Sequence, residues 1–150
     1  MMVAGPAARF EQVRSALTPM TGDLWYVGER ADLAASYKLF GNAMILALGG
    51  AMADIFHLAD ALHVERAEAW ALFSRFKPEN ILPVRAQKIL AEDDSAAFEL
   101  TMARKDARLM VESAGDEPVP VLSAIAARMD QLIASGHGAS DLAVLARRGA

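Results

Sequence analysis

The fold of this chain is decided by a long uninterrupted segment, residues 32–62, which reads DLAASYKLFGNAMILALGGAMADIFHLADAL. No proline interrupts this segment, and its apolar residues recur with helical spacing. A helix of this length extends about 46 Å, at about 1.5 Å per residue. Its middle is apolar on nearly every side, so we expect other helices to bury it from several directions.

The most apolar part of the segment, residues 39–53, contains no charged side chain and lies between Lys38 and Asp54. It is shorter than the ~20 residues that span a bilayer, which favours a buried helix over a membrane span. Three glycines interrupt the segment, at positions 41, 49 and 50. Each costs about 1 kcal/mol of helix propensity, which we expect close approach of neighbouring helices to offset.

The composition fits one domain with a substantial core, since 54% of the 150 residues are apolar. The chain has no cysteine, which excludes disulfides, thiolate nucleophiles and cysteine-ligated metals. Its net charge of −4 gives no indication of a nucleic-acid partner. The first residues lack the basic and apolar regions of a signal peptide, so we expect a cytoplasmic protein without membrane contact.

Shorter helical patterns surround the long segment, and the chain is predicted to be mainly all-α. A short apolar run at residues 24–27 predicts one strand. The last helix is expected to begin at Asp141 with Ser140 as its cap. The other expected helices cover residues 6–18, 65–76, 81–91, 97–114 and 119–135.

Lys38 and Asn42 are the first candidates for chemistry, because residues four apart share one helix face. Their neighbours are apolar, and removal of water lowers a lysine pKa toward the range in which it exchanges protons at neutral pH. An asparagine beside it offers an amide donor and a carbonyl acceptor that orient a hydroxyl or carboxylate. The alternative is that Lys38 extends to solvent and Asn42 bonds a neighbouring helix.

A second candidate group combines the cations Arg104, Lys105 and Arg108 with Asp106. Three cations on one helix could bind an anionic substrate or a cofactor phosphate. The alternative is a solvated helix face, with Glu99 and Asp106 as the partners of these cations.

The three histidines form no recognisable motif. Asp54, His57 and Asp60 are spaced to share a helix face, but no metal-binding pattern accompanies them, so we expect structural or surface histidines and no metal. His137 lies between two glycines, where it faces either a cleft or solvent. The glycines form neither G-x-G-x-x-G nor a Walker loop, and no G-x-S-x-G element marks a nucleophilic serine.

Residues 37–43, YKLFGNA, resemble the K-x-x-x-N helix segment of the β-hydroxyacid dehydrogenases, the family of 3-hydroxyisobutyrate dehydrogenase and the glyoxylate/succinic semialdehyde reductases. Asp54 stands sixteen residues after the lysine, where that family commonly has glutamate. Phe98 followed by Lys105 and Asp106 resembles its F-x-x-x-x-x-x-K-D segment. Residues 136–141, GHGASD, resemble its late G-x-G-x-x-D element.

This resemblance implies an enzyme with an N-terminal Rossmann domain for NAD or NADP and a helical C-terminal domain like that of 6-phosphogluconate dehydrogenase. It implies that Lys38 is the catalytic proton donor or acceptor and that Asn42 orients the substrate. It places Lys105 at the nicotinamide-ribose end of the cofactor, with Phe98 and Asp106 shaping the substrate site. The long helix of this domain also forms the dimer in the family.

The chain departs from the family in two places. Residues 28–36, GERADLAAS, stand where the family usually has a glycine-rich stretch, and so resemble the related imine reductases and reductive aminases. Those enzymes typically have another residue at the lysine position, so Lys38 favours alcohol or carbonyl chemistry. The second departure is the Rossmann domain, of which residues 1–28 resemble only the end. We therefore expect a helical domain over residues 29–150, inactive by itself, from a truncated or remnant gene.

Two functions follow from these patterns. The first is the catalytic and dimerisation half of an NAD(P)-dependent oxidoreductase, acting on a small β-hydroxyacid or carbonyl acid or, like an imine reductase, on an imine. The second is a non-catalytic helical dimer module without cofactor binding. In both cases the segment 32–62 is too apolar for a surface helix, which predicts a homodimer packed through it.

Overall fold

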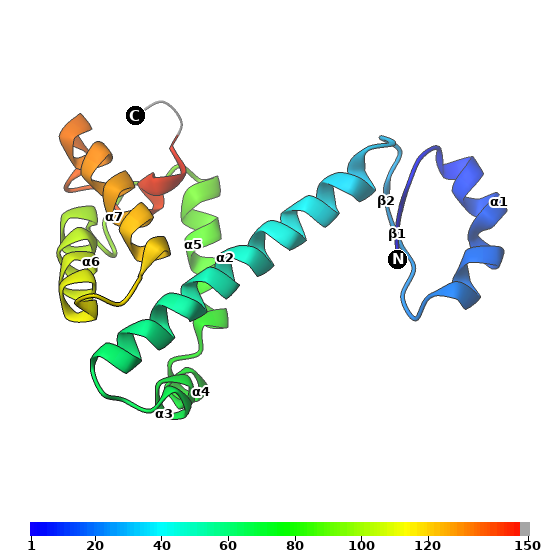
Figure 1. The fold of residues 1–150 in the computed structure, drawn as a ribbon. Helices are drawn as coiled ribbons and strands as arrows, with labels where there is room; N and C mark the ends of the chain where they lie inside the picture. The colour runs from blue at the N-terminus through cyan, green and yellow to red at the C-terminus, as the bar shows by residue number, and fades with distance from the viewer. Residues whose placement is uncertain (148–150) are drawn as a thin grey trace. The chain divides into compact units, whose positions relative to one another are not determined.

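The computed structural model describes residues 1–147 and divides them into two compact units, one ending at Leu48 and one beginning at Gly49. The boundary falls inside helix α2, Leu33–Ala61, so each unit is described by itself (Figure 1). The structure is mainly helical, as predicted. The predicted domain boundary at residue 28 stays a prediction.

The first unit contains a small strand–helix–strand arrangement. Its elements are strand β1 (Met2–Ala4), helix α1 (Ala7–Leu17), the 3-10 turn η1 (Thr18–Met20) and strand β2 (Trp25–Gly28). The two strands pair in parallel, with Met2 opposite Trp25. Phe10 of α1 is buried against the sheet and stacks on Tyr26, with ring centroids 4.7 Å apart. The expectation of a single strand was wrong, because a strand as short as β1 shows no alternating pattern.

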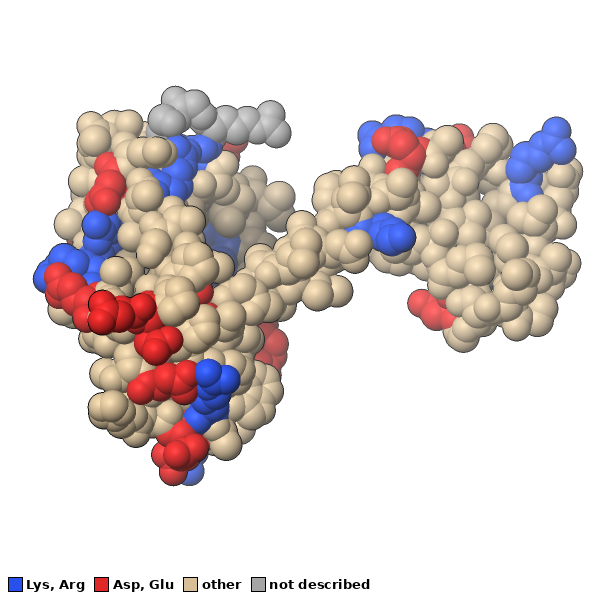
Figure 2. Space-filling view, in the orientation of Figure 1, with Lys and Arg blue, Asp and Glu red and all other residues tan. Residues whose placement is uncertain are grey.

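Helix α2 begins and ends within one residue of its predicted bounds. Residues 38–49 are all exposed, so the expectation that other helices of this chain bury the middle of α2 was wrong for this stretch. Residues 39–49 contain no charged side chain, and Figure 2 shows this part of α2 in tan. Among residues 1–147, α2 is the one helix whose length and composition would suffice to cross a membrane.

The second unit holds the C-terminal half of α2 beside α7 and has a separate core. The centre of that core is formed by Leu100, Leu132 and Val144, which are almost fully buried. The elements after α2 are α3 (Arg66–Ala71), α4 (Phe73–Phe76), η2 (Pro78–Asn80), α5 (Ile81–Leu90), α6 (Leu100–Ala114), α7 (Pro120–Leu132), the π-helical turn η3 (Ile133–His137) and the 3-10 turn η4 (Leu142–Ala146).

Several predicted helix bounds differ from the structure. The helix expected at 65–76 divides into α3 and α4. Helix α7 ends at Leu132 rather than residue 135, and Gly136 then adopts a φ of 90°, which a helix does not permit. The last turn is 3-10, and its cap is Asp141 rather than Ser140, because the Asp141 carboxylate accepts the backbone N–H of Ala143.

Helices α2 and α7 meet closely at Gly50, where an added Cβ would lie 2.8 Å from Val121 Cγ2. Nothing lies within 4 Å of the corresponding point at Gly41 or Gly49. The expectation of close helix approach at the glycines is therefore confirmed within this chain at Gly50 alone.

Asp54 supplies a cap to α7 from another helix. Its side chain is buried, and Oδ2 accepts the backbone N–H of Leu122 at 2.7 Å. The first turn of α7 contains no acidic residue and its N-cap, Val119, has no capping side chain, so this carboxylate takes the place of a local cap.

We expect Asp54→Ala to lower the free energy of unfolding by about 1–2 kcal/mol, because it leaves the Leu122 N–H buried without an acceptor. Asp54→Asn retains an oxygen acceptor and should lose less. Urea unfolding followed by circular dichroism measures both variants. The control is Asp116→Ala, which removes an exposed carboxylate. A loss in Asp54→Ala no larger than in this control would contradict the capping role.

Candidate functional site

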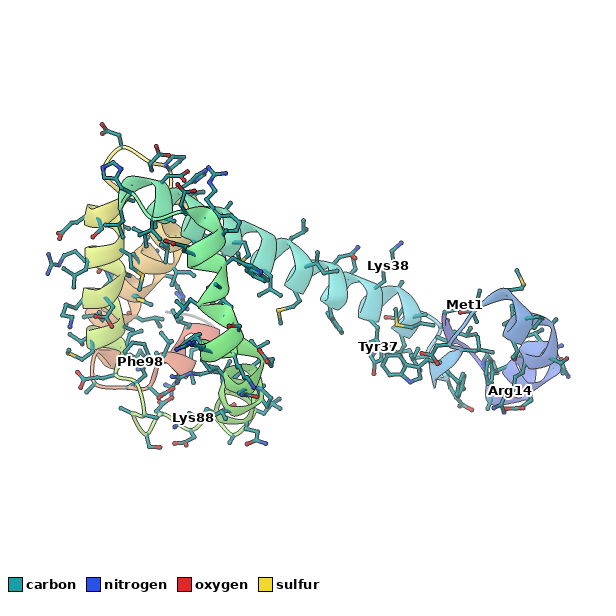
Figure 3. The ribbon with its side chains drawn as sticks, turned by 90° about the horizontal axis from the view of Figure 1, so that it is seen from below. Met1, Arg14, Tyr37, Lys38, Lys88 and Phe98 are labelled. Carbon is teal, nitrogen blue, oxygen red and sulfur yellow. The ribbon has the colours of Figure 1, made fainter. Side chains whose placement is uncertain are left out.

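Helix α2 places Lys38 and Asn42 one turn apart, as predicted, and both side chains are exposed. Lys38 and Tyr37 project from opposite sides of the helix (Figure 3). Tyr37 packs on Trp25 and Phe40, with ring centroids 5.5 and 6.1 Å away. These aromatic contacts fix the start of α2 against β2.

The surroundings of Lys38 differ from the expected water-poor environment. Its apolar neighbours Leu39 and Phe40 are themselves 67% and 66% exposed. Among residues 1–147, Lys38 has neither a hydrogen-bond nor an ion-pair partner. Its ammonium group is therefore open to solvent in the part of the chain that the structure describes.

Phe98 lies in the second unit and is held by its backbone. Its N–H donates to Asp141 Oδ2 at 3.0 Å, and its carbonyl accepts the N–H of Leu142 at 2.9 Å. Its half-buried ring packs against the core beneath the Arg85 guanidinium, 5.9 Å from the ring centroid. These contacts give Phe98 a structural role in addition to the predicted place at the substrate site.

Asp141 is fully buried and is the electrostatic centre of this region. Its carboxylate accepts the N–H groups of Ala97, Phe98 and Ala143 and an Arg85 N–H at 2.9 Å. Burial alone raises the pKa of Asp141. The three backbone hydrogen bonds and the Arg85 charge outweigh that effect and lower the pKa to about 2. The charged form is therefore the one that the fold stabilises.

The cations of α6 are paired within the chain. Arg104 forms two hydrogen bonds with Asp130 of α7, at 2.7 and 3.0 Å, and Arg108 pairs with Glu112 at 2.7 Å. Lys105 contacts the carboxylate of its neighbour Asp106 at 3.2 Å, and both remain about half exposed. The expectation of Glu99 as a partner was wrong. Of these cations, Lys105 is the one least engaged by the rest of the second unit.

The residues of the predicted site thus belong to different units. Lys38 and Asn42 lie in the first, whereas Phe98, Lys105 and Asp106 lie in the second. Within the second unit, Phe98 stands just before α6, and Lys105 and Asp106 lie in its middle.

Asp54, His57 and Asp60, which were predicted to share a helix face, make contacts that stabilise the fold. His57 Nδ1 lies 2.5 Å from the Pro118 carbonyl oxygen and donates to it. Asp60 forms a two-oxygen pair with Arg66, whose hydrogen bonds lower the pKa of Asp60. Within residues 1–147, no group of three or more histidine, aspartate or glutamate side chains could hold a metal ion. His137, at the end of η3, is partly exposed.

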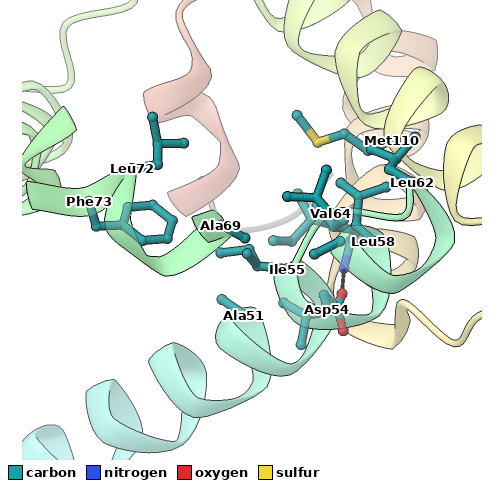
Figure 4. A pocket seen from close by; sticks show the side chains of 14 residues that line it. Ala51, Asp54, Ile55, Leu58, Leu62, Val64, Ala69, Leu72, Phe73 and Met110 are labelled. Atoms are coloured by element: carbon teal, nitrogen blue, oxygen red, sulfur yellow. Dashed lines mark hydrogen bonds between the residues drawn. The ribbon is translucent and has the colours of Figure 1, made fainter. Parts of the chain in front are cut away.

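An apolar cavity of about 450 Å³ lies in the second unit between the end of α2 and helices α3, α4, α6 and α7 (Figure 4). Sequence reasoning missed it, because its walls come from five helices whose packing the sequence does not show. Its lining is apolar and includes Leu58, Leu72 and Met110. Asp54 also lines it, and one of its carboxylate oxygens accepts the backbone N–H of Leu122.

A second, polar cavity of about 610 Å³ lies beside the end of α5 and η4. Its cations are already neutralised: Lys88 pairs with Asp93 at 2.9 Å, and Arg147 pairs with Asp94. The hydrogen bonds of Ser95 and Lys88 lower the pKa of Asp93. The cations of this cavity therefore offer little free charge to an anionic ligand.

No protein-family model and no curated protein matches the chain. Solved structures match it closely in fold. An imine reductase from Pseudomonas sp. superposes with a TM-score of 0.81 at 17% identity, over 96% of this chain and 52% of that one. An imine reductase from Myxococcus stipitatus, in complex with NADP⁺, has a TM-score of 0.79 at 18% identity, over 96% and 55%.

A reductive aminase from Aspergillus terreus, in complex with NADPH and ethyl levulinate, has a TM-score of 0.82 at 18% identity and covers 95% of this chain and 51% of that one. The chain thus spans about half the length of the structures it matches. At these identities the likeness establishes the fold.

The low pKa of Asp141 predicts a pH-dependent contribution to stability. Its folded pKa lies below the ordinary value near 3.9, so the contribution is complete above about pH 4 and is lost as the pH falls toward 2. Asp141→Asn should lower the free energy of unfolding by about 2 kcal/mol at pH 7 and by much less at pH 2. Urea unfolding between pH 2 and 7 measures this.

The control is Asp106→Asn, which removes a half-exposed carboxylate and should change stability by less than about 0.5 kcal/mol throughout. A difference between wild type and Asp141→Asn that stays constant with pH would contradict the assigned cause.

Proposed function

We propose that this chain is the helical substrate-binding and dimerisation half of an NAD(P)-dependent oxidoreductase, with a domain like the C-terminal domain of 6-phosphogluconate dehydrogenase. The observation that carries the proposal is the superposition of nearly the whole chain on half of imine reductases and a reductive aminase. Two of those structures were solved with NADP⁺ or NADPH. The small parallel β1–α1–β2 arrangement is also typical of a nucleotide-binding sheet.

In this proposal the bound nicotinamide cofactor supplies or accepts the hydride. Lys38 donates or accepts the proton at the substrate oxygen, and Asn42, one turn later, orients the substrate. The exposed Lys105 ammonium fits the ribose and phosphate end of the cofactor, because Asp106 is its single charged contact among the described residues. Phe98 and Asp106 shape the substrate site.

We propose a small β-hydroxyacid or carbonyl acid as the substrate, since an amine such as Lys38 suits proton exchange with a hydroxyl or carbonyl oxygen. An imine reductase-like reaction is the second candidate, and it is favoured by the names of the matching structures. A non-catalytic helical module remains the third. For each of them we propose a cytoplasmic protein.

The catalytic test joins this chain to the C-terminal end of a Rossmann domain that binds NADPH. We expect the fusion to oxidise NADPH with small carbonyl acids and Lys38→Ala to lower kcat at least ~100-fold, the usual contribution of a positioned general acid. The control is Lys77→Ala, which removes an exposed lysine of the loop after α4. A Lys38→Ala rate like that of wild type would sink the catalytic assignment, and turnover of imines alone would favour the second candidate.

We also propose that the chain is a homodimer through α2. Six large apolar side chains of its exposed half are 49–76% exposed: Leu39, Phe40, Met44, Ile45, Leu46 and Leu48. Monomeric proteins rarely expose so many large apolar side chains in one stretch of helix, and such exposure marks an interaction surface.

Sedimentation velocity at micromolar concentration should therefore give a dimer. Met44→Glu should give a monomer, because it places a charge in the apolar surface. The matched control, Ser113→Glu, adds the same charge to the exposed side of α6 and should remain dimeric. A wild-type monomer would refute the homodimer.

A further inference from the structure

Arg85, in the middle of α5, acts on Phe98 by two separate routes. Its Nη1 donates to Asp141 Oδ1 at 2.9 Å, and the other oxygen of that carboxylate accepts the backbone N–H of Phe98 at 3.0 Å. Its guanidinium also lies over the Phe98 ring, 5.9 Å from the centroid, which is within the range of a cation–π contact. One side chain therefore acts on both the backbone and the ring of Phe98.

The first route depends on the charge of Arg85. Asp141 is fully buried, and among residues 1–147 Arg85 forms its one ion pair. A buried carboxylate that loses its counter-charge is costly to keep in place. The N–H groups of Ala97 and Phe98 both donate to Asp141 Oδ2, so a shift of this carboxylate would release the backbone just before α6.

Attachment of α5 does not account for these contacts. The helix contributes no buried side chain to the core, and Lys88 ties it to the loop before α6. The Lys88 ammonium pairs with Asp93 at 2.9 Å and donates to the Ser95 carbonyl at 2.6 Å. In the described part of the chain, however, the Phe98 ring has a cation over its face from Arg85 alone.

We propose that Arg85 is a positioning residue of the substrate site, which fixes the backbone and the ring of Phe98 at the start of α6. This inference rests on the proposed function, in which Phe98 shapes the substrate site. In this role Arg85 acts through Phe98 and need not touch the substrate. Substrate binding should therefore depend on Arg85, whereas proton transfer by Lys38 should not.

Arg85→Lys separates the two routes. It keeps a cation for Asp141 but loses the flat guanidinium that lies over the ring. In the fusion that binds NADPH, we expect this variant to raise the KM for the carbonyl acid at least about fivefold, with kcat and the KM for NADPH changed less than about twofold. A merely structural loss would lower the amount of active enzyme and leave the KM for the substrate unchanged.

The matched control is Lys88→Met, which removes the other ionic contact of α5 and leaves the contacts of Asp141 and Phe98 in place. We expect it to change the KM for the substrate less than about twofold, because it does not act on the ring.

A double-mutant cycle tests whether Arg85 acts through Phe98. Phe98→Leu should itself raise the KM for the substrate. Adding Arg85→Lys to it should raise this KM less than about twofold further, because the ring on which the guanidinium acts is gone. Effects that multiply in the double variant would contradict the proposed route.

Amide hydrogen exchange of the 150-residue chain gives a readout without activity. Arg85→Met removes both routes, so the amides of Ala97 and Phe98 should exchange about tenfold faster or more than in Lys88→Met, while those of α7 keep their rates. If Arg85→Met does not fold, the kinetics of Arg85→Lys decide.

The possible failures are distinct. An active fusion in which Arg85→Lys leaves the KM for the substrate unchanged would overturn the positioning role and leave the proposed function. An equal rise of this KM in Lys88→Met would do the same, since attachment of α5 would then explain both. A fusion that is inactive with Arg85 in place would overturn the proposed function and the positioning role together.

Discussion

The second unit depends on the buried carboxylate of Asp141. This group joins three segments far apart in sequence: the end of the loop before α6, the Arg85 side chain of α5 and the turn η4. Next to it, the carbonyl oxygens of Gly138 and Ser140 accept the first free N–H groups of α6, from Thr101 and Leu100. Residues 138–144 thus cap the start of α6 and cover the core formed by Leu100, Leu132 and Val144.

The contacts of Asp141 also explain why the start of α6 could not be predicted from the sequence. The bounds of α2 were predicted to within one residue, because helical spacing and the lack of proline are local properties. The start of α6 was expected at residue 97 but lies at Leu100. The N–H groups of Ala97 and Phe98 are held by Asp141, more than forty residues later. A contact of that range leaves no local pattern in the sequence.

The candidate site shows the same division between local and non-local information. The spacing of Lys38 and Asn42 on one helix face was predictable from the sequence. The pairing of Arg104 with Asp130, which joins α6 to α7, and the cavity behind α2 were not, because each depends on how separate helices pack. The exposure of α2 was misjudged for the same reason. Apolar composition indicates that a surface needs cover without indicating which chain provides it.

The proposed chemistry and the proposed assembly make the same physical demand. A lysine exchanges protons near neutral pH when water around it is reduced, yet Leu39 and Phe40 beside Lys38 stand open to solvent. Ile45 and Leu46, three and four residues after Asn42, share its face of the helix and are also exposed, so any surface that covers them removes water from Lys38 and Asn42 as well. Packing of α2 against a second copy would therefore do more than hide apolar area. The second copy would supply part of the apolar surface that excludes water from Lys38, which a single chain lacks. The acid–base property of Lys38 would then depend on the oligomeric state.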